Sequence, residues 1–243
     1  MNAQVRNITC ELIATFALTF VGAGAILVNA WTGGEPGLVG IALAHGIILS
    51  IAVSATMNIS GGHVNPAVTM GLLATGRIKP GAAIGYIVGQ CAGATIAGVL
   101  LAMIFRSLGA GGAEISGAQA MANSMLGTPN FGNQISAGMA VWVEAILTFL
   151  LVFAVFGTAV DPRAPKIGGF GIGLTVGVDI LMGGPITGAA MNPARTIGTL
   201  LGGGSVTSAL WSQHWVYWVG PVVGGVAAAW VYEALIMQRQ TPR

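Results

Sequence analysis

The chain has 243 residues, of which 54% are hydrophobic and only 7% are charged. A soluble domain carries about 25% charged residues, so the composition excludes a soluble globular protein and predicts an integral membrane protein. The net charge of +2 gives no indication of nucleic-acid binding. The two cysteines, Cys10 and Cys91, lie in apolar stretches and predict neither a disulfide framework nor a metal site.

Six apolar stretches are long enough to cross a bilayer as helices, which predicts an all-α membrane protein. In chain order they cover residues 8–31, 38–59, 82–105, 135–160, 167–186 and 214–237. The first of them is too long to be the apolar part of a cleavable signal peptide.

Two short stretches, at residues 60–69 and 187–196, interrupt this pattern in the same way. Each contains Asn-Pro-Ala, and proline suits the first position of a helix whereas the residue before it is pushed out of the helical region. Asn is a good N-cap, and its amide NH₂ then stays free to donate outward. The motif residues are Asn65, Pro66 and Ala67 in the first copy and Asn192, Pro193 and Ala194 in the second.

The apolar residues after each motif predict a half-helix, over 65–75 in the first copy and 192–202 in the second. Ten residues of helix span about 15 Å, which is half of a hydrocarbon layer of about 30 Å. Two such helices that enter from opposite faces would meet at the middle of the membrane. Their positive dipole ends and their Asn amides would then point at the same place.

The chain therefore contains two copies of a unit of three spans with an inserted half-helix. The copies cover residues 1–106 and 135–243, and a flexible extracellular loop at 107–134 joins them. Glu11 and Glu144 occupy matching positions in the first span of each copy. Because three spans is an odd number, the second copy must be inverted relative to the first.

Positive charges test this topology. Seven of the nine Lys and Arg residues fall in segments that a six-span chain places on one side of the membrane, and Arg106 alone falls on the other side. The positive-inside rule makes the crowded side cytoplasmic, so both termini are expected in the cytoplasm. The cell (plasma) membrane is the expected location. The seven residues are Arg6, Arg77, Lys79, Arg163, Lys166, Arg239 and Arg243.

Six spans with a duplicated Asn-Pro-Ala, the second followed by Arg195, resemble the aquaporin (major intrinsic protein) family over nearly the whole chain. The resemblance implies an hourglass pore in each protomer of a homotetramer. It implies a passive channel, with no enzyme activity, cofactor or metal, that conducts water in single file and excludes protons and ions.

The family's narrowest point is a ring of four residues, which by position are His45, Ile180, Ala189 and Arg195. This ring departs from the water-only pattern and resembles that of some plant tonoplast intrinsic proteins. A wider opening is implied, with ammonia, hydrogen peroxide and urea as candidate solutes. A glycerol or urea facilitator stays open as an alternative, although Thr196 stands where the glycerol branch carries Asp.

The polar residues of the apolar stretches then receive expected roles. Asn65 and Asn192 are expected to be the central donors of the pore, and Arg195 a donor and cation barrier. His45 is expected to line the pore, where it would be a titratable group near neutral pH. Glu11 and Glu144 are expected to bond the exposed backbone of the two irregular loops.

His63 keeps two interpretations, since it either braces its loop or contacts the pore. The sequence does not explain Asp179, and bracing of the loop around 183–191 is one interpretation of it. A function of another class is an intramembrane metalloenzyme built from His45, His63 and His214 with the buried acids, but these spacings fit no metal motif.

Overall fold

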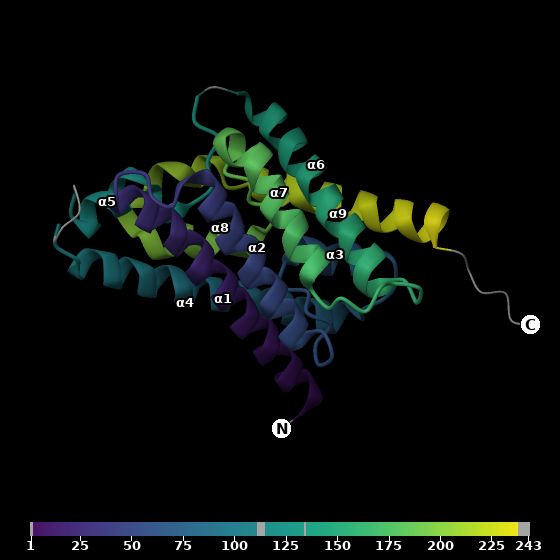
Figure 1. The fold of residues 1–243 in the computed structure, drawn as a ribbon. Helices are drawn as coiled ribbons and strands as arrows, with labels where there is room; N and C mark the ends of the chain where they lie inside the picture. Colours follow the sequence, from purple (N-terminus) through teal and green to yellow (C-terminus); the bar gives the residue numbers. More distant parts are fainter. Residues whose placement is uncertain (1, 111–114, 134, 238–243) are drawn as a thin grey trace, which may run out of the picture.

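The computed structural model describes residues 2–110, 115–133 and 135–237, and within them it contains six helices that are long and apolar enough to cross a membrane (Figure 1). They confirm the predicted all-α fold class, and the protein is a multi-pass integral membrane protein. The spans are α1 (Ala3–Trp31), α2 (Gly37–Thr56), α4 (Pro80–Ser107), α6 (Ala137–Val155) with its π-helical continuation η2 (Phe156–Val160), α7 (Phe170–Thr187) and α9 (Val216–Val231) with its π-helical continuation η4 (Tyr232–Ile236).

Two short helices begin at the prolines of the repeated motif. Helix α3 (Pro66–Ala74) has nine residues, and α8 (Pro193–Gly203) has eleven and is followed by the 3₁₀ helix η3 (Gly204–Gln213). The side-chain oxygen of Asn65 accepts from the backbone N–H of Ala67, and that of Asn192 from those of Ala194 and Arg195. Both caps therefore form as the sequence predicts, because the interaction involves only neighbouring residues.

The two halves pack by the same scheme. Helix α1 packs against α4, its counterpart α6 packs against α9, and α2 packs against α7 across the centre. Each half-helix packs mainly on the third span of the other half, α3 on α9 and α8 on α4. A Cβ on Gly93 would collide with the Leu12 carbonyl, and a Cβ on Gly224 with that of Ala145, so these glycines allow close helix crossings within one chain.

The connector between the halves is folded in its described part, in contrast to the flexible loop that its composition suggests. It contains α5 (Gly117–Asn123) and a 3₁₀ turn, η1 (Met125–Gly127), at the end of the bundle away from the N-terminus (Figure 1). Ala120 and Leu126 are fully buried among apolar residues of α1 and α4. Burial of these few apolar side chains fixes a segment that reads as a Gly- and Ser-rich linker.

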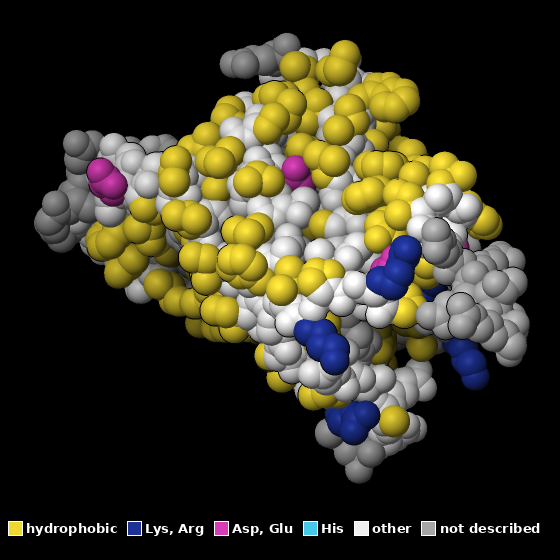
Figure 2. All heavy atoms as spheres, turned by 45° about the vertical axis from the view of Figure 1, so that its right-hand side comes forward, with side chains coloured by type: hydrophobic (Ala, Val, Ile, Leu, Met, Phe, Trp, Pro, Cys, Tyr) yellow, Lys and Arg dark blue, Asp and Glu magenta, His cyan; other side chains and the backbone are white. Residues whose placement is uncertain are grey.

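Figure 2 shows apolar side chains over most of the visible face, with the Lys and Arg side chains gathered toward one end. This distribution suits a surface that is in contact with lipid in the middle and with water at its ends. Arg239 and Arg243, which the charge count includes, lie outside the described residues.

Candidate pore

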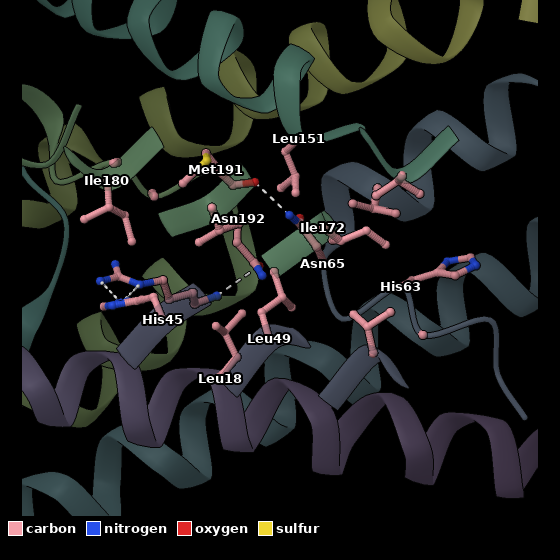
Figure 3. A pocket seen from close by; sticks show the side chains of 18 residues that line it. Leu18, His45, Leu49, His63, Asn65, Leu151, Ile172, Ile180, Met191 and Asn192 are labelled. Carbon is pink, nitrogen blue, oxygen red and sulfur yellow. Dashed lines mark hydrogen bonds between the residues drawn. The ribbon is translucent and has the colours of Figure 1, made fainter. Parts of the chain in front are cut away.

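The two half-helices meet tip to tip near the centre of the bundle. The Nδ2 of Asn65 donates to the Met191 carbonyl at 2.8 Å, and the Nδ2 of Asn192 donates to the Val64 carbonyl at 2.9 Å (Figure 3). One N–H of each amide is thus bound to the opposite loop, whereas the sequence suggests that the whole NH₂ group stays free. The loop carbonyls need these donors because they have no helical partner.

A buried carboxylate holds the first loop in its irregular shape. The Oε1 of Glu11 accepts from the Ser60 hydroxyl (2.7 Å) and the His63 backbone N–H (3.0 Å). Its Oε2 accepts from the Val64 N–H (2.6 Å) and the Gln90 amide (2.8 Å). Four donors therefore surround one fully buried acid, which accounts for its place inside the protein.

Glu144 holds the second loop in the same way. Its Oε1 accepts from the Thr187 hydroxyl (2.7 Å) and the Ala190 N–H (3.0 Å), and its Oε2 from the Met191 N–H (2.8 Å). Met191 has a φ of 51°, a left-handed conformation that a non-glycine residue rarely adopts. The carboxylate contributes to holding this strained backbone in place.

Two tyrosine hydroxyls complete the loop supports. Tyr86 donates to the Ser60 carbonyl and Tyr217 to the Thr187 carbonyl, both at 2.7 Å. The sequence does not predict these two hydrogen bonds. The internal repeat could have indicated them, because Tyr86 and Tyr217 occupy equivalent positions in the two halves, as do Ser60 and Thr187.

A narrow cavity lies between the loops, and it shares lining residues with a wider cavity at each of its ends. The space open to water is about 20 Å³ in the narrow segment, about 300 Å³ in one mouth and about 260 Å³ in the other. His45 and Ile180 lie toward one end of the narrow segment, His63 toward the other, and the two Asn residues between them (Figure 3). Much of the remaining wall is apolar, from Leu18, Leu49, Val53, Val68, Leu151, Val155, Ile172 and Val176.

The four residues expected at the constriction all line this narrow segment. They are His45, Ile180, Ala189 and Arg195, and all but Ala189 also line the larger mouth. The Nε and Nη2 of Arg195 lie 3.3 and 3.1 Å from the Nε2 of His45. The Nη1 of Arg195 is buried and has no hydrogen-bond partner among the described residues.

The hydrogen bonds of His45 define its protonation state. Its Nδ1 lies 2.8 Å from the Ile41 carbonyl, which can only accept, so Nδ1 carries the hydrogen. Its Nε2 faces two N–H groups of Arg195 and must therefore be the acceptor. This geometry is that of a neutral imidazole with its hydrogen on Nδ1.

Comparison with known proteins gives the family. The model of the family described as "Major intrinsic protein" matches residues 1–232. The chain belongs to the major intrinsic protein family. It is 43% identical to "Aquaporin TIP4-4" of Zea mays over 241 residues, and this match covers 96% of this chain and 87% of that protein. It is 41% identical over 247 residues to "Probable aquaporin TIP3-2" of Arabidopsis thaliana, with 96% and 85% covered.

A solved structure shows the same fold. The aquaglyceroporin from Plasmodium falciparum superposes with a TM-score of 0.79 at 24% identity, and the match covers 96% of this chain and 97% of that one. The family match and the curated relatives make the protein an aquaporin-family channel, and its family is one of channels rather than enzymes.

Part of the lining of the wider mouth comes from the connector between the two halves, which the sequence does not indicate. Ser124, Thr128 and Asn130 of the connector line it together with His45 and Arg195. Nothing in the Gly- and Ser-rich composition of the connector signals this position, because it depends on how α5 packs on the bundle.

His63 makes contacts of both expected kinds. Its Nδ1 lies 3.1 Å from the Thr69 hydroxyl and its ring meets Tyr86 edge to face, with centroids 5.0 Å apart. It also lines both the narrow segment and the smaller mouth. Bracing of the loop and contact with the cavity are therefore compatible.

The structure does not explain Asp179. Its carboxylate accepts no hydrogen bond from the loop at 183–191, and its Oδ2 is buried without a partner among the described residues. The three histidines do not form a metal site either: no group of three or more His, Cys, Asp or Glu within the described residues could hold a metal ion. His214 instead packs edge to face with Trp211, with centroids 5.7 Å apart.

Proposed function

We propose that the protein is a passive channel that conducts water in single file and excludes protons and ions. The observation that carries this proposal is the narrow segment of about 20 Å³ between two mouths of about 300 and 260 Å³. A single water needs roughly 10–15 Å³, so the narrow segment suits molecules that pass one at a time. Its apolar wall offers few competing hydrogen bonds to a passing molecule.

The central donors of this channel are Asn65 and Asn192. Each has one amide N–H that is not used by the opposite loop, and these hydrogens suit the oxygen of a passing water. Both amides sit at helix N-termini, whose positive dipole ends oppose a proton or cation at the same point. Pro66, Ala67, Pro193 and Ala194 start the two helices, and Glu11, Glu144 and His63 support their loops.

The selectivity constriction of the proposed channel consists of His45, Ile180, Ala189 and Arg195. Arg195 offers its unpartnered Nη1 to a solute oxygen and adds a second barrier to cations. Ile180 and Ala189 supply no bulky aromatic ring, which supports passage of ammonia, hydrogen peroxide and urea as well as water. A glycerol or urea facilitator is the alternative within the same family.

The experiment is a stopped-flow comparison of proteoliposomes with empty liposomes, using water, urea, glycerol, ammonia and hydrogen peroxide in turn. We expect accelerated water flux without an increased proton leak, and urea uptake above glycerol uptake. Glycerol uptake that equals urea uptake would favour the facilitator. Water flux equal to that of empty liposomes would contradict the proposal.

We also propose a homotetramer with both termini in the cytoplasm. Native mass spectrometry tests the assembly, and protease access to tags at each terminus tests the topology. For the location, the TIP-type relatives of plants favour the tonoplast rather than the plasma membrane that was expected. Imaging of a tagged chain in the cells that make it decides between the two membranes.

A further inference from the structure

Gly22 of α1 lies directly against the imidazole of His45. A Cβ built on Gly22 would lie 2.5 Å from Cδ2 and 3.0 Å from Cε1 of that ring, and closer still to Nε2. Ordinary contacts between such atoms are about 3.5–4.0 Å, so any side chain here would displace the ring by about 1 Å. Gly24, two positions further along the same helix, differs: its Cβ would meet only Leu101, at an ordinary 3.5 Å.

The surroundings of His45 leave the ring one direction in which to move. Helix α2 cannot retreat from α1, because on its other side a Cβ on Gly46 would lie 2.8 Å from the carbonyl oxygen of Gly173, so the α2 and α7 backbones are already in contact. The Nδ1 of His45 is bound to the Ile41 carbonyl in its own helix. Since the helix and the Nδ1 end of the ring are both held, we expect a displaced ring to move toward the cavity that it lines.

We propose that Gly22 is a positioning residue that determines the solute specificity of the constriction. Because it has no side chain, the His45 ring stays back from the lumen with its Nε2 on Arg195. The opening is then wide enough for solutes larger than water. This inference rests on the proposed channel function. It assigns a part in solute selectivity to a residue that does not itself line the narrow cavity.

The test compares Gly22→Ala with the matched control Gly24→Ala in proteoliposomes. For Gly22→Ala we expect uptake of the largest solute that the wild type passes, or of water if nothing else passes, to fall at least threefold. Gly24→Ala should match the wild type. In a His45→Ala background, where no ring is present to be displaced, Gly22→Ala should have no further effect.

A helix that is merely perturbed would behave differently. An effect of Gly22→Ala that persists in the His45→Ala background would overturn the inference, as would an unchanged uptake in a conducting channel. If Gly22→Ala alone does not fold, His45→Ala should restore folding, and a failure to do so counts against the proposal. A wild type that conducts nothing contradicts the channel function itself, which separates the two failures.

Discussion

Asn65 and Asn192 each donate one amide hydrogen to the backbone of the loop that carries the other. The exchange ties the tips of the two half-helices together and turns the remaining N–H of each amide away from that contact. Since the two residues are 127 positions apart in sequence, the same pair of bonds also joins the two halves of the chain. One residue type thus caps a helix, closes the centre of the fold and supplies a donor to the cavity.

Replacement of either residue by Asp tests the proposed barrier. Asn192→Asp keeps the capping oxygen but removes the N–H and places a negative charge where two positive helix ends meet. We expect the proton or cation leak of proteoliposomes to rise at least fivefold, and Asn65→Asp to behave alike. Asn130→Asp, which adds the same charge in the wider mouth, is the control. Equal leaks in all three variants would refute the central barrier.

The hydrogen bonds of Glu144 and Glu11 predict that loss of either carboxylate lowers the thermal stability of the protein. Gln in place of Glu144 offers one acceptor instead of two and turns an NH₂ group toward backbone donors. Loss of hydrogen bonds to a buried charged group amounts to about 3 kcal/mol. A loss of that size lowers the midpoint of thermal unfolding by about 6–12 °C in a chain of this length.

Glu11→Gln should show a decrease of similar size, because Glu11 has equivalent partners in the first loop. Glu35→Gln is the control, since Glu35 is exposed. Unfolding of purified protein in detergent gives the three midpoints. A midpoint for Glu144→Gln as high as that for Glu35→Gln would show that the carboxylate does not hold the loop.

The parts of this fold that were predictable depend on neighbouring residues. Pro66 and Pro193 start helices through their own geometry, so both half-helices can be located from sequence. The bond between Asn192 and Val64 spans 128 residues, and no local pattern indicates it. The contact of Gly22 with His45 likewise depends on the rotation of α1 against α2.

Two features of the structure were not predicted from the sequence. The connector at 107–134 has a linker-like composition, yet a few apolar side chains bury enough surface to fold its described part. Asp179 has no role that the sequence predicts, and its carboxylate accepts no hydrogen bond from the loop that follows it. The burial of the connector depends on packing between distant segments, which composition does not record.

His45→Phe tests the constriction. Phenylalanine is larger than histidine and cannot accept from Arg195, so the opening narrows and the guanidinium loses a partner. We expect water permeability within about threefold of wild type and urea uptake reduced at least tenfold. His214→Phe, outside the cavity, should leave both unchanged. The same solute profile in His45→Phe as in wild type would place His45 outside the constriction.

Asp161, outside the spans, gives a prediction about pH. Hydrogen bonds from the Arg163 side chain, at 2.9 and 2.6 Å, and from its backbone N–H, at 2.8 Å, hold the pKa of Asp161 well below its ordinary value of 3.8. A depressed carboxyl pKa contributes stability above the ordinary value and loses it as the pH falls toward the folded-state pKa. The contribution is therefore complete at neutral pH and declines only below about pH 4.

Asp161→Asn should accordingly lower the unfolding midpoint by the same amount at pH 8, 6.5 and 5, and by less at pH 3.5. Lys166→Gln, a change to an exposed neighbour in the same connection, should leave the midpoint unchanged at each pH. Scans of the purified variants in detergent measure both differences. A deficit of Asp161→Asn that grows as the solution becomes more acidic would have the wrong sign for a depressed carboxyl pKa, and would show that the ion pair with Arg163 does not form.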